Sequence, residues 1–425
     1  MHNPGPFAYF VFILWIPISA IMFAQNKPRR AAFLVLIGGT MVLPELVAFD
    51  LPILPAIDKM SMVGACAFVG LFFTAKSRWQ RMRLLRGMQL FFFIFVIGNI
   101  GTSMTNPESF MFGGKLAWPG GPRFPIVSIP PLAKTEFIAM TISDFFDLFM
   151  PFAVGQMLVQ DRDDLIVFLK SYAMATVIYA VPMLWEVVMS PQLHRYAYGY
   201  HALSFSHNVR GDGFKPTVLL NSGLGLAMFQ FVGMTAAIAL RRTKHKVGQS
   251  LTGGTATLIL LFALSLSRNV GVMLYSGVAI PLLLAARPRM QTRVAFVLIL
   301  LFITFPITRA KEWFPVDDII AYVEKRSPER ASSLGFRFEN EDILLEHTAE
   351  KPTFGWGSFG RNRRYDEESG KDISVTDGEW AIHYSVRGAF GAVGWFWLIA
   401  LPVLWGTWFI RRVPEREDQI LLAAV

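Results

Sequence analysis

Residues 251–308 read LTGGTATLILLFALSLSRNVGVMLYSGVAIPLLLAARPRMQTRVAFVLILLFITFPIT, and this stretch is decisive for the fold class. It holds three apolar runs that are long enough, or nearly so, to cross a hydrocarbon core of about 30 Å. The first polar break contains Arg268 and a glycine, and the second is basic. We therefore expect two short spans joined by a tight turn, then a third span: 251–267, 270–286 and 293–308.

The rest of the 425-residue chain repeats this pattern. Hydrophobic residues make up 53% of it and charged residues only 17%, against about 25% charged residues in a soluble domain. This composition excludes a disordered protein, a nucleic-acid module and a soluble two-domain enzyme. We predict an all-α polytopic membrane protein with eleven or twelve spans, the twelfth near residues 50–60. The other eight apolar runs are 7–24, 31–49, 60–75, 88–105, 136–159, 165–189, 217–240 and 388–410.

Basic residues predict the orientation of the chain. They cluster after the first, third, seventh, ninth and eleventh runs, so they share one face of the membrane. The loop 160–164 is short and acidic and is the one exception. Because basic loops stay in the cytoplasm, we expect the N-terminus outside and the C-terminal tail inside. The net charge of +9 then reflects orientation and not nucleic-acid binding.

This topology gives three parts. Residues 1–308 form a bundle with short loops, 309–387 a large outer loop, and 388–425 the last span with a cytoplasmic tail. The large loop carries 12 Lys and Arg against 16 Asp and Glu, so it is net negative while the rest of the chain is basic. Function is expected where polar groups collect, which is the outer face.

Three arginines are predicted at that face: Arg210, Arg268 and Arg337. An arginine fork donates two parallel hydrogen bonds to a phosphate and keeps its charge. We expect the three to meet in one outward-facing cavity that binds the diphosphate of a lipid. The alternative for Arg268 is a structural charge at the membrane surface, and acidic neighbours in the sequence could simply neutralise Arg337.

The large loop contains further candidates. Residues 335–350 have a helical pattern that puts Arg337 and Glu341 on one side. The stretch Gly355-Trp356-Gly357 follows, where glycines permit close backbone approach to a ligand and an aromatic ring can stack on a sugar. A simple turn is the competing interpretation.

Acidic groups and a histidine precede the last span. Asp377, Glu379 and His383 are candidate general bases for an acceptor hydroxyl, although Asp377 also suits a helix cap. Asp144 and Asp147 lie inside the fifth run, where acids are uncommon. We expect them to support Arg268 or another arginine. No spacing of His or Cys predicts a metal site.

The order of these motifs resembles the O-antigen ligase and O-antigen or exopolysaccharide polymerase superfamily, which includes the Wzy-type polymerases. The resemblance covers roughly residues 200–410 and rests on short motifs. They are Arg210 followed by Gly213 and Pro216, Ser-Leu-Ser267-Arg268, Pro352-Thr-Phe-Gly-Trp-Gly357, Thr-Asp377-Gly and Arg387-Gly388-Ala-Phe-Gly391-Ala-Val-Gly394.

The resemblance implies a GT-C-like membrane glycosyltransferase at the periplasmic face of the bacterial inner membrane. It implies an inverting, metal-independent enzyme without a cofactor, which takes a glycan from undecaprenyl diphosphate. The arginines would bind the diphosphate, and a base in the large loop would activate the acceptor. The implied partners are an undecaprenyl-diphosphate-linked oligosaccharide, membrane lipid, and chain-length regulator and flippase proteins.

Two other functions compete with a polymerase. A ligase of this superfamily is expected to carry a histidine where this chain has Asp377-Gly378, which favours the polymerase. A transporter of lipid-linked sugars would show symmetric halves and charges deep in several helices, whereas the ionisable residues here concentrate at the outer face. A purely structural scaffold would leave the three arginines unexplained.

Overall fold

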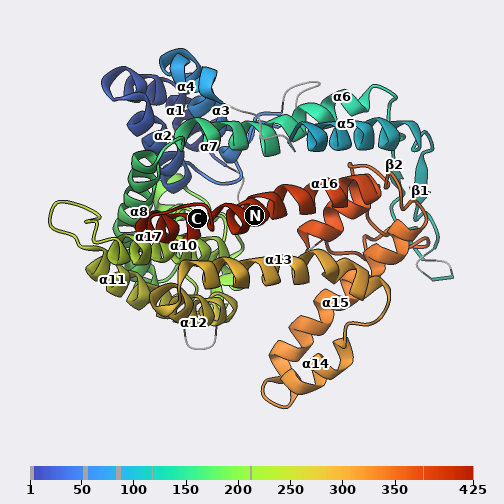
Figure 1. The fold of residues 1–425 in the computed structure, drawn as a ribbon. Helices are drawn as coiled ribbons and strands as arrows, with labels where there is room; N and C mark the ends of the chain where they lie inside the picture. The colour runs from blue at the N-terminus through green and yellow to red at the C-terminus, as the bar shows by residue number, and fades with distance from the viewer. Residues whose placement is uncertain are drawn as a thin grey trace. The chain divides into compact units, whose positions relative to one another are not determined.

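The computed structural model describes residues 4–50, 56–82, 88–116, 118–119, 121–210, 213–376 and 378–424, and it is mostly helical (Figure 1). The chain forms two compact units, each assembled from segments far apart in the sequence. The first unit comprises Met1–Arg83, Phe145–Val294 and Gly406–Val425, and the second comprises Leu84–Asp144 and Ala295–Trp405. The segment 309–387 therefore lies wholly in the second unit.

The first unit is built mainly of helices around a core from α8, α10 and α11. Its elements are α1 (Pro6–Gln25), α2 (Pro28–Val42), α3 (Lys59–Thr74), α4 (Lys76–Arg81), a π-helical turn (Phe145–Phe149), α7 (Met150–Leu158), α8 (Arg162–Met189), α9 (Leu193–Tyr198), a 3₁₀ turn (Phe205–Asn208), β3 (Val209–Arg210), β4 (Gly213–Phe214), α10 (Gly223–Arg242), α11 (Gly253–Ser265), α12 (Val270–Ala285) and α17 (Arg416–Ala423).

The second unit combines helices with a short antiparallel β-hairpin. Its elements are α5 (Met88–Met104), β1 (Phe110–Phe112), β2 (Val127–Ile129), α6 (Glu136–Asp144), α14 (Val316–Glu324), α15 (Pro328–Ala349) and most of α13 (Pro288–Ala310) and α16 (Glu379–Phe409). In the hairpin, Phe110 is opposite Ile129. Figure 1 shows α14 and α15 as a helical hairpin, and the two helices pack on each other.

Each of the eleven predicted runs overlaps helical structure. In the described part of the chain, six helical segments are long and apolar enough to cross a membrane: Pro6–Gln25, Glu136–Leu158, Arg162–Met189, Gly223–Arg242, Pro288–Arg309 and Glu379–Phe409. Four more apolar helices are shorter, and they include α11 and α12. The prediction of two separate helices around Arg268 is thus confirmed. The arrangement is consistent with a helical, multi-pass membrane protein.

Several predicted helix ends were wrong. The second run was expected to reach residue 49, but α2 ends at Val42 because Pro44 disfavours helix at the residue before it. The seventh was expected to begin at residue 217, but α10 begins after Ser222, whose hydroxyl caps it by accepting from the Gly225 N–H. The proposed twelfth span falls partly on residues 51–55, which lie outside the described residues.

Asp164 lies in the acidic loop 160–164, which is the exception to the clustering of basic residues in the odd-numbered connections. Its buried carboxylate pairs with Arg29 at 2.6 Å and with Arg78 at 2.8 Å. These residues follow the first, third and fifth runs, so the structure brings three odd-numbered connections together, as the charge pattern predicts. The side of the membrane that they occupy stays a prediction.

Helix α16 has a sharp kink at Gly388, whose φ of +61° lies in the left-handed region. The kink interrupts the helical hydrogen bonding, and the Ala389 N–H donates to the carbonyl of Pro352 at 2.8 Å. The segment after α15 is thereby joined to the kink. The last span was predicted to begin at residue 388, which is where the second helical segment of α16 begins. A first segment, from Glu379 to the non-helical Gly388, precedes it.

Replacing Gly388 by alanine is expected to destabilise this junction. A Cβ at this position would lie 2.4 Å from the backbone carbonyl of Thr353, and the left-handed backbone costs an L-residue roughly 1–2 kcal/mol in addition. Thermal unfolding of the purified protein in detergent measures the loss. Gly406→Ala in the same helix is the control, since nothing lies within 4 Å of its Cβ position. Equal melting temperatures for the two variants would contradict this account of the kink.

Candidate functional site

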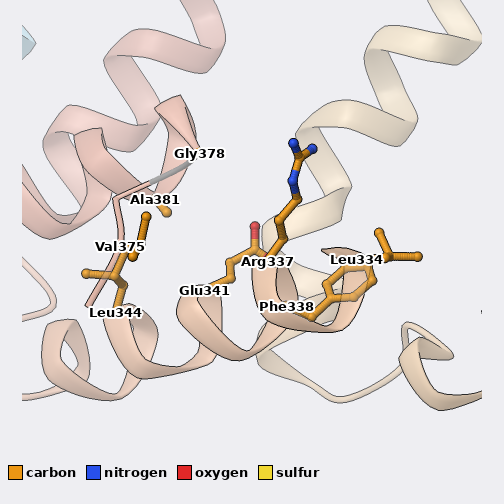
Figure 2. Close-up of a pocket in the computed structure, with 8 residues that line it drawn as sticks. All are labelled: Leu334, Arg337, Phe338, Glu341, Leu344, Val375, Gly378 and Ala381. Carbon is orange, nitrogen blue, oxygen red and sulfur yellow. The ribbon is translucent and has the colours of Figure 1, made fainter. Parts of the chain in front are cut away.

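A cavity of about 190 Å³ in the second unit brings together α15 and the start of α16 (Figure 2). Arg337 and Glu341 line it from one side of α15, as the helical spacing predicted. Helix α15 begins at Pro328 and not near Gly335, since proline favours the first turn of a helix. The full lining is Leu334, Arg337, Phe338, Glu341, Leu344, Val375, Gly378 and Ala381.

The Glu341 carboxylate is held by two donors. Arg309, at the end of α13, donates from Nε to Glu341 Oε2 at 3.1 Å, and the Trp380 indole N–H donates to Oε1 at 2.9 Å. The Arg309 side chain is almost fully buried and also pairs with Asp342. Glu341 is therefore fixed in place with its helix neighbour Arg337 on the cavity wall.

Burial raises the pKa of Glu341 above its ordinary value, although the hydrogen bonds from Arg309 and Trp380 oppose the rise. A raised pKa brings a carboxylate closer to the range where it works as a general base near neutral pH. Sequence reasoning treated Glu341 only as a possible neutralising neighbour of Arg337. No local pattern in the sequence indicates its pair with Arg309, because that arginine lies on a different helix.

This raised pKa predicts a pH effect on stability. The folded state holds the Glu341 proton more tightly than the unfolded chain does, so the protonated group stabilises the fold below its ordinary pKa. That contribution is lost as the pH rises through the folded-state pKa. Comparing wild type with Glu341→Gln by thermal unfolding from about pH 4 to about pH 7 should show a steeper fall for wild type. Parallel profiles would contradict the prediction.

The three predicted bases have different environments. Asp377 lies outside the described residues, but Val375 and Gly378 on either side of it line the Arg337 cavity. Glu379 is exposed, and its carboxylate lies 3.9 Å from His383 Nε2. The His383 ring stacks on Trp395, with centroids 5.4 Å apart. Neither Glu379 nor His383 belongs to the lining of this cavity.

The glycines at 355 and 357 approach protein backbone and side chains. The N–H groups of Trp356 and Gly357 donate to the carbonyls of Ser385 and Val386 in the kinked helix, each at 2.9 Å. A Cβ on Gly355 would lie 2.7 Å from the Ser385 carbonyl oxygen. At Gly357 a Cβ would lie 2.5 Å from the Leu132 side chain. The expectation that these glycines make room for a ligand is therefore corrected, because α16 fills the space at Gly355 and Leu132 fills it at Gly357.

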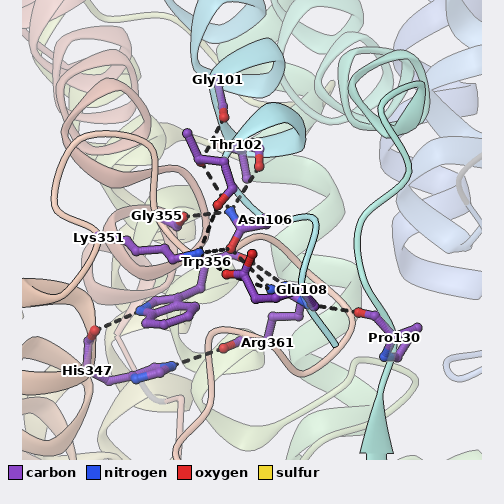
Figure 3. Close-up of polar contacts among 11 residues, drawn as sticks. Gly101, Thr102, Asn106, Glu108, Pro130, His347, Lys351, Gly355, Trp356 and Arg361 are labelled. Carbon is purple, nitrogen blue, oxygen red and sulfur yellow. Dashed lines mark hydrogen bonds and ion pairs between the residues drawn. The ribbon is translucent and has the colours of Figure 1, made fainter. Parts of the chain in front are cut away.

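Trp356 is enclosed on both faces (Figure 3). The His347 ring stacks on it at 4.3 Å, and the Lys351 ammonium lies 4.5 Å from its centroid. Its indole N–H donates to the His347 carbonyl at 2.7 Å. A sugar ring therefore has no open Trp356 face to stack on in this arrangement, and Trp356 serves to hold the loop against α15.

In the first unit the structure brings Arg268 to the Arg210 hairpin. Arg210 pairs with Gly213 across β3 and β4. A Cβ on Gly213 would meet the Arg268 guanidinium at 2.4–2.7 Å, so this glycine leaves room for the arginine. Arg268 itself has φ +53°, a strained conformation for a residue with a side chain. Arg337 belongs to the second unit, and the meeting of all three arginines stays a prediction.

The segment after this hairpin is positioned by a buried carboxylate, which was not predicted from the sequence. Glu186 is fully buried near the end of α8 and accepts backbone N–H bonds from Leu193, Thr217 and Val218 at 2.7–2.9 Å. It thereby fixes the turn that leads from the hairpin into α10. An acid near the end of an apolar run was the available signal.

Asp144 and Asp147 belong to different units: Asp144 ends a segment of the second unit, and Asp147 lies in the first. Asp144 accepts from Arg387 Nη2 at 2.6 Å and from Asn99 Nδ2 at 2.7 Å, and Arg387 Nε donates to Asn99 Oδ1 at 2.9 Å. Asp144 thus supports an arginine, but the partner is Arg387 and not Arg268. Asp147 lies in the π-helical turn of the first unit and is exposed.

Among the described residues, no group of three or more His, Cys, Asp or Glu side chains is placed to hold a metal ion.

Comparison with models of known protein families and with curated proteins finds no match to this chain. The resemblance to the ligase and polymerase superfamily therefore rests on the sequence motifs alone. The geometry adds two local arrangements: a cavity with Arg337 and Glu341, and the packing of Arg268 against the Arg210 hairpin.

Proposed function

We propose that the protein is a bacterial inner-membrane glycosyltransferase that polymerises undecaprenyl-diphosphate-linked oligosaccharide repeat units at the periplasmic face. The product is an exopolysaccharide or an O-antigen. The observation that supports this best is that Arg337 and the carboxylate of Glu341, which Arg309 holds in place, line the same cavity. A polymerase of this kind needs one group for the departing diphosphate and another for the acceptor proton.

The proposed step is a single displacement. An acceptor hydroxyl oxygen forms a bond to the anomeric carbon of the donor sugar, and the bond from that carbon to the diphosphate oxygen breaks. The hydroxyl proton passes to a carboxylate or histidine, and undecaprenyl diphosphate leaves with the bonding electron pair. Arginine stabilises the growing negative charge because it is placed before the reaction begins.

Roles are proposed for three sets of residues. Arg337, Arg268 and Arg210 bind the diphosphate. The base is chosen from Asp377, Glu379 and His383, to which the structure adds Glu341 as a candidate because it lines the cavity. Asp144 supports the fold through Arg387. A chain-length regulator and a flippase are the proposed protein partners.

The strained Arg268 backbone supports a role for that residue beyond anchoring. An αL conformation costs an L-residue roughly 1–2 kcal/mol, and such strain concentrates at functional sites. A glycine or asparagine would suit the turn better if only the turn mattered. Gly213 adds a second requirement, since its missing side chain is what lets the Arg268 guanidinium reach the hairpin.

Glycan size in a deletion strain tests the proposal. The strain is complemented with wild type or with Arg268→Ala, and lipid-linked and surface glycans are separated by size. A polymerase predicts single repeat units on their lipid carrier in the deletion strain, and long chains only with wild type. Long chains that form on the carrier but never reach their final acceptor would identify a ligase. Normal chains in the deletion strain would contradict both assignments.

A further inference from the structure

A second cavity in the second unit shares no lining residue with the Arg337 cavity. It has a volume of about 290 Å³ and lies between the β1–β2 hairpin, the end of α15 and the segment that follows Trp356. Its volume is close to the lower limit of ligand pockets, about 300 Å³. The argument concerns six of its lining residues: Phe110, Phe112, Arg361, Arg363, Arg364 and Tyr365.

Aromatic rings form one wall of this cavity. Phe112 and Tyr365 stack nearly parallel, with centroids 5.2 Å apart, and Phe110 meets Phe112 on the same strand. All three rings are partly exposed, unlike the enclosed Trp356. Residues 110 and 112 share a face because side chains alternate along a strand. Phe112 therefore lies between Phe110 and Tyr365, and the partly exposed Tyr365 ring ends this stack on the cavity wall.

Charged groups surround the aromatic wall. Arg363 pairs with Asp372 at 2.6 Å, and Arg364 pairs with Glu350 at 3.2 Å, and both arginines are exposed. Each guanidinium has five N–H donors, so an ion pair through one nitrogen leaves donors for other groups. Because each arginine already faces a carboxylate, this rim suits neutral hydroxyl groups better than a phosphate.

The floor of the cavity is held rigidly by Arg361, whose side chain is fully buried (Figure 3). Its guanidinium donates to the carbonyls of Trp356, Glu108 and Pro130 at 2.7–3.1 Å. It also lies 4.8 Å from the Phe110 ring centroid. These bonds tie the segments that flank β1 and β2 to the loop, so the cavity is formed before any ligand binds. A preformed site loses less entropy on binding.

We propose that this cavity binds a short segment of the acceptor glycan, a function that rests on the polymerase proposal above. A sugar ring has an apolar face of C–H groups, which packs on aromatic rings, and hydroxyls at its edge, which bond to charged side chains. The aromatic wall and the charged rim match these two parts. Such a subsite would hold the growing chain near the enzyme between additions and lengthen the product.

Binding of a soluble glycan tests the subsite directly. The probe is a set of short oligosaccharides made by partial acid hydrolysis of the polysaccharide from the wild-type strain, titrated into the purified full-length protein. Wild type should bind, and Tyr365→Ala should bind on the order of tenfold more weakly, which corresponds to about 1.4 kcal/mol. Arg364→Ala, at an exposed position, is the second variant. The matched control is Phe336→Ala, an exposed aromatic on α15 outside the cavity.

Chain length is the second measurement. Complementation with Tyr365→Ala or Arg364→Ala should give shorter chains than wild type or Phe336→Ala. If wild type fails to bind the oligosaccharides, or both cavity variants match the control in binding and chain length, the subsite is overturned even where polymerisation is normal. If no strain depends on the protein for chain growth, the polymerase proposal fails, whereas the titration still reports whether the cavity binds sugar.

Discussion

Replacing Arg337 by alanine is expected to lower the rate of polymer formation on the order of 10²–10³-fold. That range is typical for removal of one fixed donor that stabilises developing charge. Arg337 lies on the wall of the cavity with Glu341, so its loss removes the proposed diphosphate-binding cation while Arg309 still pairs with Glu341. Folding should be little affected because Arg337 is exposed.

Two further variants make this result specific. Arg337→Lys keeps the charge but loses the bidentate fork, so its activity should fall between wild type and the alanine variant. Arg330→Ala removes another exposed arginine of α15 that does not line the cavity and should leave activity near wild type. The rate of incorporation of lipid-linked repeat units into polymer is measured for each protein at equal amounts. Equal losses for Arg337→Ala and Arg330→Ala would show that Arg337 has no special role.

Among the variants described, Asp144→Ala is expected to lose the most stability. It leaves Arg387 mostly buried without its carboxylate partner, with side-chain exposure of only 12%. Breaking a buried ion pair by removing one partner typically costs about 3–5 kcal/mol. Asn99 retains its bond to Arg387 but cannot supply the missing charge. The variant should therefore melt at a much lower temperature or fail to accumulate in the membrane.

A double variant separates charge burial from packing. Asp144→Leu with Arg387→Met removes both charges and should recover much of the stability that Asp144→Ala loses, because an apolar pair of similar volume often replaces a buried ion pair. Asp147→Asn, at the exposed acid one turn away, should lose far less. Thermal unfolding in detergent and protein yield are both measured. A single Asp144→Ala variant as stable as Asp147→Asn would contradict the importance of the Arg387 pair.

The helices were largely predictable because long apolar runs have few other folds available in a membrane. The two helices around Arg268 could also be predicted, since a charge and a glycine interrupt the run there. Helix ends were less predictable. Pro44 ended α2 early, and a helical segment from Glu379 to the kink at Gly388 precedes the predicted start of the last span.

The candidate site was only partly predictable because it depends on contacts between distant residues. The helical spacing correctly placed Arg337 and Glu341 together, since that spacing is local. The Arg309–Glu341 pair joins two different helices, and no local pattern indicates it. Glycine spacing around Trp356 correctly indicated close backbone approach, but the approaching partner is the kink of α16.

Reconstitution tests the central proposal most directly. Purified protein in liposomes is given lipid-linked repeat units extracted from the deletion strain, and both the glycan length and the free undecaprenyl diphosphate are measured. The proposal predicts a ladder of longer glycans with one undecaprenyl diphosphate released for each linkage formed. With Arg337→Ala both products should form on the order of 10²–10³-fold more slowly. The proposal would be contradicted if folded wild-type protein left the repeat units unchanged or only moved them across the bilayer.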